Sequence, residues 1–130
     1  MAEFSTSVLL VDDYVPLRRT LRGLLQQIGF RNIDEADDGA VALAKLKERG
    51  FGLIISDWNM KPISGLEFLI KVRSNDEHKD TPFIMVTALG GMEQVIAAKE
   101  AGVSNFIVKP FNTATLKKKI ESVLRGPEPE

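Results

Sequence analysis

An uncharged, mostly apolar run that ends in a carboxylate is the feature that most constrains this chain. Residues 53–56 comprise three large apolar side chains and one serine, and Asp57 follows directly. A short apolar run of this kind is typical of a strand that is buried on both faces of a sheet. Asp57 would then lie at the carboxyl end of that strand, which is the edge where open α/β sheets bind ligands.

A second run of the same kind lies near the beginning of the sequence. Residues 8–11 are all apolar and lead into Asp12 and Asp13. If this strand is the neighbour of the strand that ends at Asp57, three carboxylates converge on one crevice. The two runs together predict an acidic site at the carboxyl edge of a sheet.

Strand-like and helix-like segments alternate five times along the chain. We expect strands at residues 7–11, 31–36, 53–56, 82–86 and 104–108. We expect helices within residues 16–29, 37–50, 66–73, 92–102 and 113–124. Such alternation predicts an α/β fold, a doubly wound five-stranded parallel sheet with five helices on its two faces. The flavodoxin-like strand order 2-1-3-4-5 places the first and third strands side by side.

Size and composition favour one domain and exclude several function classes. The 130 residues are 44% apolar and 27% charged, which suits a single domain over residues 1–130, with a core of about 7–125 and a tail at 126–130. A net charge of -1 argues against nucleic acid as a partner. The absence of cysteine excludes disulfides and thiolate metal sites. With no signal-peptide pattern and no apolar run long enough to span a bilayer, we expect a cytoplasmic monomer without membrane insertion.

Three ionised carboxylates in one crevice repel one another. At about 5 Å and an effective dielectric constant of about 20, each pair costs roughly 3 kcal/mol. Either one acid stays protonated or a divalent cation neutralises the site. Oxygen ligands without cysteine or a nearby histidine favour a hard cation, Mg²⁺ first. Because Mg²⁺ takes only one or two carboxylates, one carboxylate oxygen would remain free to attack phosphorus.

Hydrogen-bond donors follow the fourth and fifth strands at the same edge. Thr87 offers a hydroxyl group, Ala88 a backbone N–H, and Lys109 a positive charge, with Pro110 behind it to fix the backbone. Phosphoryl transfer needs donors of this kind around the oxygens of the transferred group. His78, the single histidine, lies in a polar segment, and we expect it to be solvated rather than to act as a phosphotransfer group.

Taken together, these positions resemble the receiver domain of two-component response regulators. The resemblance rests on Asp12-Asp13, Asp57, Thr87-Ala88 and Lys109-Pro110-Phe111, and it covers residues 7–124. Within the family, the chain is most similar to the stand-alone chemotaxis regulators of the CheY type, on the segments 57–60, 96–98, 109–111 and 114–116.

The resemblance implies that Asp57 accepts a phosphoryl group from a phosphohistidine of a CheA-like histidine kinase. It implies a Mg²⁺ site formed by Asp13, Asp57 and the main-chain carbonyl of Asn59, with Asp12 bound through water. The phosphoryl oxygens would be held by Thr87, Ala88 and Lys109. The chain would be a signalling domain and no enzyme beyond its own phosphorylation and dephosphorylation.

A switch is also implied by the resemblance. Thr87 would move toward the phosphoryl group and the ring of Phe106 would turn inward, which reshapes the surface of the fourth helix, fifth strand and fifth helix. Met92 and Val95 would add apolar contacts to that surface, and Lys119 would add charge for an acidic partner. The partner would be a flagellar motor switch protein or another output protein.

Three positions depart from the family pattern. Lys61 stands where the family usually has proline, and Pro62 follows it. Phe106 replaces the usual tyrosine, and Leu89 replaces an acid that chemotaxis members often carry. The Lys109–Pro110 peptide bond is expected to be cis, as in the family.

Two other functions stay open on the sequence. One is a phosphate sink or phosphorelay intermediate that drains a shared kinase. The other is a phosphatase of the haloacid dehalogenase type, which also uses an aspartyl nucleophile with Mg²⁺. That class needs a second aspartate two residues after the nucleophile, where this chain has Asn59.

Overall fold

The computed structural model describes residues 6–88, 91–109 and 111–125, and within them strands and helices alternate as predicted. The strands are β1 (Val8–Val11), β2 (Ile33–Ala36), β3 (Leu53–Asp57), β4 (Phe83–Thr87) and β5 (Asn105–Val108). The helices are α1 (Val15–Ile28), α2 (Gly39–Glu48), α3 (Gly65–Arg73), α4 (Met92–Glu100) and α5 (Thr113–Arg125). No helix in these ranges is long and apolar enough to cross a membrane.

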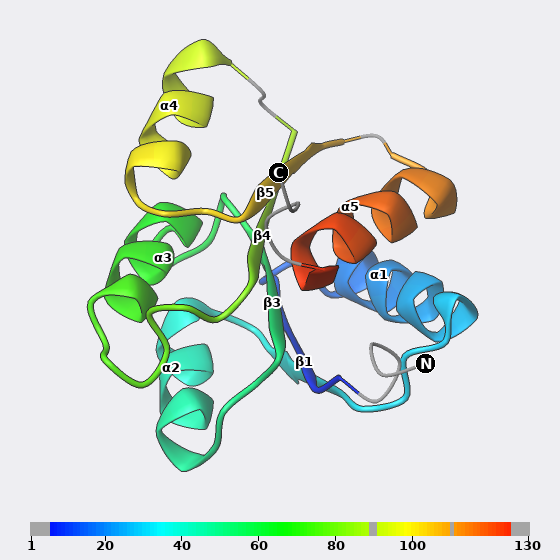
Figure 1. Cartoon of the computed structure of the whole chain (residues 1–130), viewed down its shortest axis with the longest axis horizontal. Helices are drawn as coiled ribbons and strands as arrows, with labels where there is room; N and C mark the ends of the chain where they lie inside the picture. The colour runs from blue at the N-terminus through cyan, green and yellow to red at the C-terminus, as the bar shows by residue number, and fades with distance from the viewer. Residues whose placement is uncertain (1–5, 89–90, 110, 126–130) are drawn as a thin grey trace.

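The five strands form one parallel sheet in the order β2-β1-β3-β4-β5, which confirms the predicted topology (Figure 1). In the register of β1 against β3, Val11 pairs with Ser56, so the residues that follow each of them are neighbours. Asp57 pairs in turn with Val86 of β4. The carboxyl ends of β1, β3 and β4 therefore lie next to one another at one edge of the sheet.

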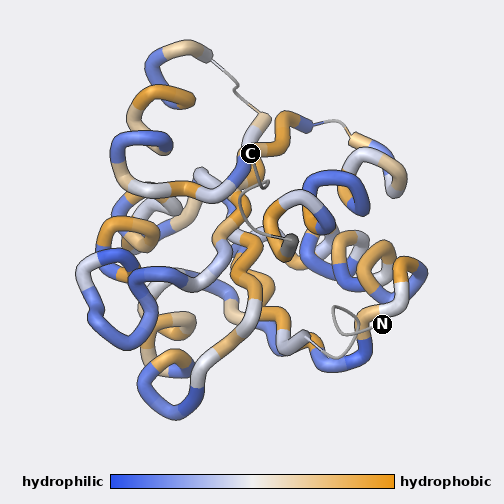
Figure 2. Tube along the Cα trace, viewed as in Figure 1, coloured by the Kyte–Doolittle hydropathy of each residue, from blue (hydrophilic) through white to orange (hydrophobic). Residues whose placement is uncertain are grey.

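Two layers of helices bury the two faces of the sheet. Helices α1 and α5 cover one face, and α2, α3 and α4 lie on the other (Figure 1). Alternate strand residues enter the two cores: Leu10 packs with the α1 and α5 side, and Leu9 with the α2 and α3 side. Both leucines are fully buried. Figure 2 shows the result, with hydrophobic residues concentrated along the central strands. Burial on both faces explains why these strands are continuous apolar runs.

The ends of the helices follow from local chemistry. Gly29, the predicted end of α1, adopts φ 129°, a conformation that glycine reaches without steric cost. At the start of α3, the hydroxyl of Ser64 accepts the N–H of Glu67 at 3.1 Å, and the Glu67 carboxylate accepts the N–H of Ser64 at 3.4 Å. This reciprocal capping box defines where the loop after β3 ends and α3 begins.

Some details of the strands and loops were not predicted from the sequence. β2 begins at Ile33, two residues later than predicted, and β3 includes Asp57 itself. The Lys61–Pro62 peptide bond is cis. The cis bond expected at Lys109–Pro110 and the substitution at Leu89 fall on positions outside the described residues.

His78 is buried, so the expectation that it is solvated was wrong. Only 6% of the residue is exposed, and its Nε2 lies 3.0 Å from the carbonyl oxygen of Leu46 in the last turn of α2. Since a carbonyl oxygen can only accept, Nε2 carries the proton. The backbone N–H of His78 also donates to the Asn75 carbonyl at 3.0 Å. The imidazole thus connects the segment between α3 and β4 to α2. The sequence does not indicate this contact, because the residues on either side of His78 are mostly charged.

We predict that His78→Ala lowers the free energy of unfolding by about 2 kcal/mol, because it leaves the Leu46 carbonyl without its donor. Urea denaturation at neutral pH measures this change. Lys79→Ala, at the exposed neighbouring position, serves as the control and should be close to neutral. Equal effects of the two substitutions would contradict a stabilising role for the His78 hydrogen bond.

Candidate functional site

Three carboxylates meet at the carboxyl edge of the sheet. One oxygen each from Asp12, Asp13 and Asp57 lie within 4.8 Å of one another. Asp12 and Asp13 follow β1 and Asp57 ends β3, so the pairing of these two strands brings the acids together. The three carboxylates thus converge at the sheet edge where the sequence predicted an acidic site.

The three acids differ in their surroundings. Asp12 is 1% exposed and Asp57 is 7% exposed, whereas Asp13 is open to solvent. The Oδ1 atom of Asp12 accepts the backbone N–H of Tyr14 at 2.9 Å. Its Oδ2 atom is buried and has no hydrogen-bond partner within the described part of the chain. A buried carboxylate oxygen without a donor is costly for the apo protein and is the kind of atom that a cation stabilises.

The pKa values of the two buried acids reflect the cost of burying a negative charge close to other carboxylates. Burial, together with the charges of Asp57 and Asp13, raises the pKa of Asp12 to about 6, although the Tyr14 N–H and the Lys109 charge oppose the change. Burial also raises the pKa of Asp57, against the opposing hydrogen bond from Lys109. An all-oxygen donor set in which the ionised forms repel one another fits a hard divalent cation such as Mg²⁺.

Lys109 supplies the positive charge of the site. Its Nζ donates to Oδ1 of Asp57 at 3.1 Å. Its backbone N–H donates to the carbonyl oxygen of Thr87 at 2.7 Å, which holds the residue against the end of β4. The lysine therefore contacts one oxygen of Asp57 from the β4–β5 side of the crevice.

Thr87, Ala88 and Asn59 lie at the same edge. Thr87 ends β4 one residue beyond Val86, the partner of Asp57, and it is fully buried. Ala88 and Asn59 are exposed. Thr87 and Ala88 thus lie at the end of β4, and Asn59 follows the end of β3, at the sheet edge that carries the acids.

Gly65 brings the start of α3 directly against the backbone of Asp57. Its N–H donates to the carbonyl oxygen of Trp58 at 2.8 Å. A Cβ atom at this position would overlap the carbonyl oxygen of Asp57 and lie 2.8 Å from the Cα of Trp58. Glycine is required here because no other residue permits this approach.

One contact to the acidic cluster was not predicted. The Nη1 atom of Arg18, on α1, donates to the main-chain carbonyl of Asp12 at 2.7 Å. The sequence carries no signal for it, because an arginine in the first turns of a helix is normally a solvent-exposed residue.

Apart from Thr87, the residues expected to form the switch and output surface lie on α4, β5 and α5. The ring of Phe106 is half-buried, and its centroid lies 6.3 Å from that of Trp58 in an edge-on arrangement at 67°. On α4, Met92 is 74% exposed and Val95 is half-buried. The Nζ atom of Lys119, on α5, donates to Oδ1 of Asn105 at 3.3 Å.

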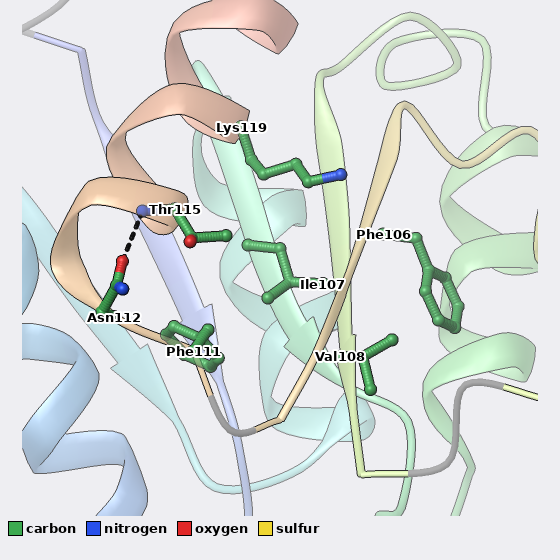
Figure 3. A pocket seen from close by; sticks show the side chains of 7 residues that line it. All are labelled: Phe106, Ile107, Val108, Phe111, Asn112, Thr115 and Lys119. Carbon is green, nitrogen blue, oxygen red and sulfur yellow. Dashed lines mark hydrogen bonds between the residues drawn. The ribbon is translucent and has the colours of Figure 1, made fainter.

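A shallow hollow of about 460 Å³ lies between β5 and α5. Its lining residues are Phe106, Ile107, Val108, Phe111, Asn112, Thr115 and Lys119. In Figure 3 the Phe106 ring points away from Lys119, toward the sheet face that carries α3 and α4. The hollow therefore combines apolar groups from β5 and Phe111 with the polar side chains of Asn112, Thr115 and Lys119.

Known proteins resemble this chain over most of its length. The family model described as "Response regulator receiver domain" matches residues 8–121. Chemotaxis protein CheY-3 of Vibrio cholerae serotype O1 is 44% identical over 116 residues, which cover 89% of each chain. Chemotaxis protein CheY of Pseudomonas aeruginosa is 42% identical over 116 residues, or 89% of this chain and 94% of that protein.

A solved structure agrees with these relatives. The structure of chemotaxis protein CheY4 of Vibrio cholerae superposes with a TM-score of 0.86 at 38% identity, covering 92% of this chain and 98% of that one. The family model spans the segments that carry the acidic cluster and Lys109. This chain therefore belongs to the response regulator receiver domain family, the signalling domains of two-component systems.

Proposed function

We propose that the chain accepts a phosphoryl group on Asp57 from the phosphohistidine of a histidine kinase and, once phosphorylated, binds an output protein of a chemotaxis system. The observation that carries this proposal is the cluster itself. Three carboxylates lie within 4.8 Å of one another, and Lys109 lies 3.1 Å from the one that ends β3. The relatives named as chemotaxis proteins support the assignment to that kind of signalling. The cytoplasm is the proposed place of this signalling.

Mg²⁺ is the cofactor that these residues suit. The carboxylates of Asp12, Asp13 and Asp57 would hold it, with the main-chain carbonyl of Asn59 as the further ligand that the family resemblance implies. The unpartnered Oδ2 of Asp12 and the raised pKa of that residue support this fit. When bound, Mg²⁺ neutralises the charge that the carboxylates and the incoming phosphoryl oxygens would otherwise bring together.

The protein residues then perform the transfer. A carboxylate oxygen of Asp57 attacks phosphorus, and the P–N bond of the phosphohistidine breaks with its electron pair left on the imidazole nitrogen. Lys109 is already within hydrogen-bond distance of Asp57, so its ammonium group would follow the negative charge onto the phosphoryl oxygens. The Thr87 hydroxyl and the Ala88 N–H would donate to the remaining oxygens.

The path from the site to the output surface would run through aromatic contacts. Trp58 follows Asp57 directly and packs edge-on against Phe106 of β5. A displacement of Thr87 toward the phosphoryl group would change the space around this pair and shift the population of Phe106 conformers. The altered surface would include Met92 and Val95 of α4 and Lys119 of α5.

No specific observation favours the phosphatase alternative. Asn59 stands where that class needs its second aspartate, and the amide cannot act as a general acid or base. A phosphate sink uses the same acceptor chemistry as a switch, so the two are separated by partner binding rather than by phosphorylation.

Incubation with acetyl phosphate and Mg²⁺ should add about 80 Da to the protein, the mass of one phosphoryl group, as measured by intact mass spectrometry. Asp57→Asn should remain unmodified, because an amide is not a nucleophile toward phosphorus. Lys109→Met should slow modification by about a hundred-fold, because it removes the donor aimed at the developing charge. An adduct of the same yield on Asp57→Asn would refute Asp57 as the acceptor.

The apo protein should become less stable as the pH rises through about 6. The raised pKa of Asp12 means that the native state binds the proton more tightly than the unfolded state, so this contribution is complete below the unfolded value of 3.8 and is lost above about 6. The full shift corresponds to about 3 kcal/mol, of which about 1 kcal/mol should be lost between pH 5 and 7, as measured by denaturation without Mg²⁺. Asp12→Asn should reduce the trend and leave only the smaller contribution of Asp57, whose pKa is also raised by burial.

Protons and Mg²⁺ should compete for the same carboxylate. Titration followed by Trp58 fluorescence should give an affinity for Mg²⁺ that falls about ten-fold for each pH unit below the Asp12 pKa of about 6. An affinity that does not change between pH 5 and 7 would contradict a role for Asp12 in cation binding.

Phosphorylation should raise the affinity for a peptide of a flagellar motor switch protein, as measured by fluorescence anisotropy. Lys119→Glu should weaken this binding about ten-fold, since it reverses the charge at the hollow beside β5. Lys118→Glu, at the exposed neighbouring position, is the matched control. Binding that phosphorylation leaves unchanged would favour the sink.

A further inference from the structure

Arg18 connects the acidic cluster to the edge strand of the sheet. Its side chain is only 14% exposed, and its Nη1 donates to the carbonyl oxygen of Asp12 at 2.7 Å. Its Nε donates to Oε1 of Glu35, on β2, at 2.7 Å. The second oxygen of Glu35 accepts Nη1 of Arg22 at 2.7 Å. The guanidinium group of Arg18 is therefore held in place by a carboxylate while it holds the main chain of Asp12.

The main chain at Asp12 is fixed from both sides. Its N–H donates to the carbonyl oxygen of Ala36 on β2 at 3.1 Å, and its carbonyl accepts Arg18. That carbonyl belongs to the peptide group that joins Asp12 to Asp13, so its orientation sets the direction in which Asp13 leaves the strand. Within the described part of the chain, no hydrogen bond or ion pair holds the exposed Asp13 carboxylate itself.

We propose that Arg18, held by Glu35, is a positioning residue for the cation site. It fixes the peptide between Asp12 and Asp13 so that both carboxylates face Asp57. A guanidinium group suits this role because its planar fork donates to a carbonyl and a carboxylate at once. The inference rests on the proposed Mg²⁺ site and adds to it two residues that do not touch the ion.

Positioning and electrostatics predict opposite effects. Arg18 is a positive charge next to the place where a cation would bind, so by charge alone its removal should tighten Mg²⁺ binding. If Arg18 instead orients the ligands, its removal should weaken binding. Residues that orient metal ligands typically change metal affinity by about ten-fold or more when they are substituted. The sign of the change therefore separates the two roles.

The experiment is a Mg²⁺ titration of the full unphosphorylated chain, followed by Trp58 fluorescence at constant pH and ionic strength. Arg18→Gln should bind Mg²⁺ about ten-fold more weakly. Arg18→Lys, which keeps the charge and loses the fork, should also bind more weakly, and it decides the question if Arg18→Gln does not fold. Arg19→Gln makes the same charge change at an exposed position of α1 and should alter the affinity by less than about two-fold. Binding by both Arg18 variants that equals or exceeds that of the parent would overturn the proposal.

The role of Glu35 has its own test. Glu35→Gln should weaken binding, and the double variant with Arg18→Gln should bind no more weakly than Arg18→Gln alone, because the two residues act as one unit. Strictly additive losses would overturn the part assigned to Glu35. A parent chain that responds to Mg²⁺ no better than Asp13→Asn would refute the proposed cation site itself. If the parent binds Mg²⁺ and the Arg18 variants bind it with the same affinity, only the positioning role is refuted.

Discussion

The parallel pairing of β1 with β3 is the constraint on which the rest of this molecule depends. It brings the carboxylates of Asp12, Asp13 and Asp57 within 4.8 Å of one another, an arrangement that their charges oppose. The strands hold it because their apolar side chains are buried on both faces between two layers of helices. The free energy of burying the core thus offsets the unfavourable electrostatics of the edge, and a bound cation would relieve them.

The positive charge at this edge is distributed unequally among the acids, and this distribution agrees with the roles proposed for them. Asp57 receives the ammonium group of Lys109 at 3.1 Å, whereas Asp12 keeps a buried oxygen without a partner within the described residues. Both pKa values are raised by burial, yet Lys109 opposes the change most directly at Asp57. Asp57 is therefore the acid better kept ionised, which agrees with its proposed role as phosphoryl acceptor, and the unpartnered oxygen of Asp12 agrees with its proposed role in cation binding.

The surroundings of the cluster are held by hydrogen bonds and close backbone packing on one side and by an aromatic contact on the other. Arg18 and Glu35 fix the end of β1 to the edge strand β2, and Gly65 lets α3 pack against the backbone of Asp57. On the opposite side, the half-buried ring of Phe106 contacts Trp58 through one edge. A signal that starts at Asp57 would thus displace the β4–β5 side more easily than the β1–β2 side.

The sequence by itself determined the five strands, their order and the three acids at one edge. Apolar runs and helical spacing are local patterns, and right-handed crossovers leave few ways to arrange them. Only the tertiary structure decided that His78 is buried against Leu46, 32 positions away, and that Arg18 bridges Asp12 and Glu35, the latter 17 positions away. Such contacts depend on which side chains face each other once the layers have packed. Neither periodicity nor composition carries that information, because polar residues near turns look alike whether they are solvated or buried with a partner.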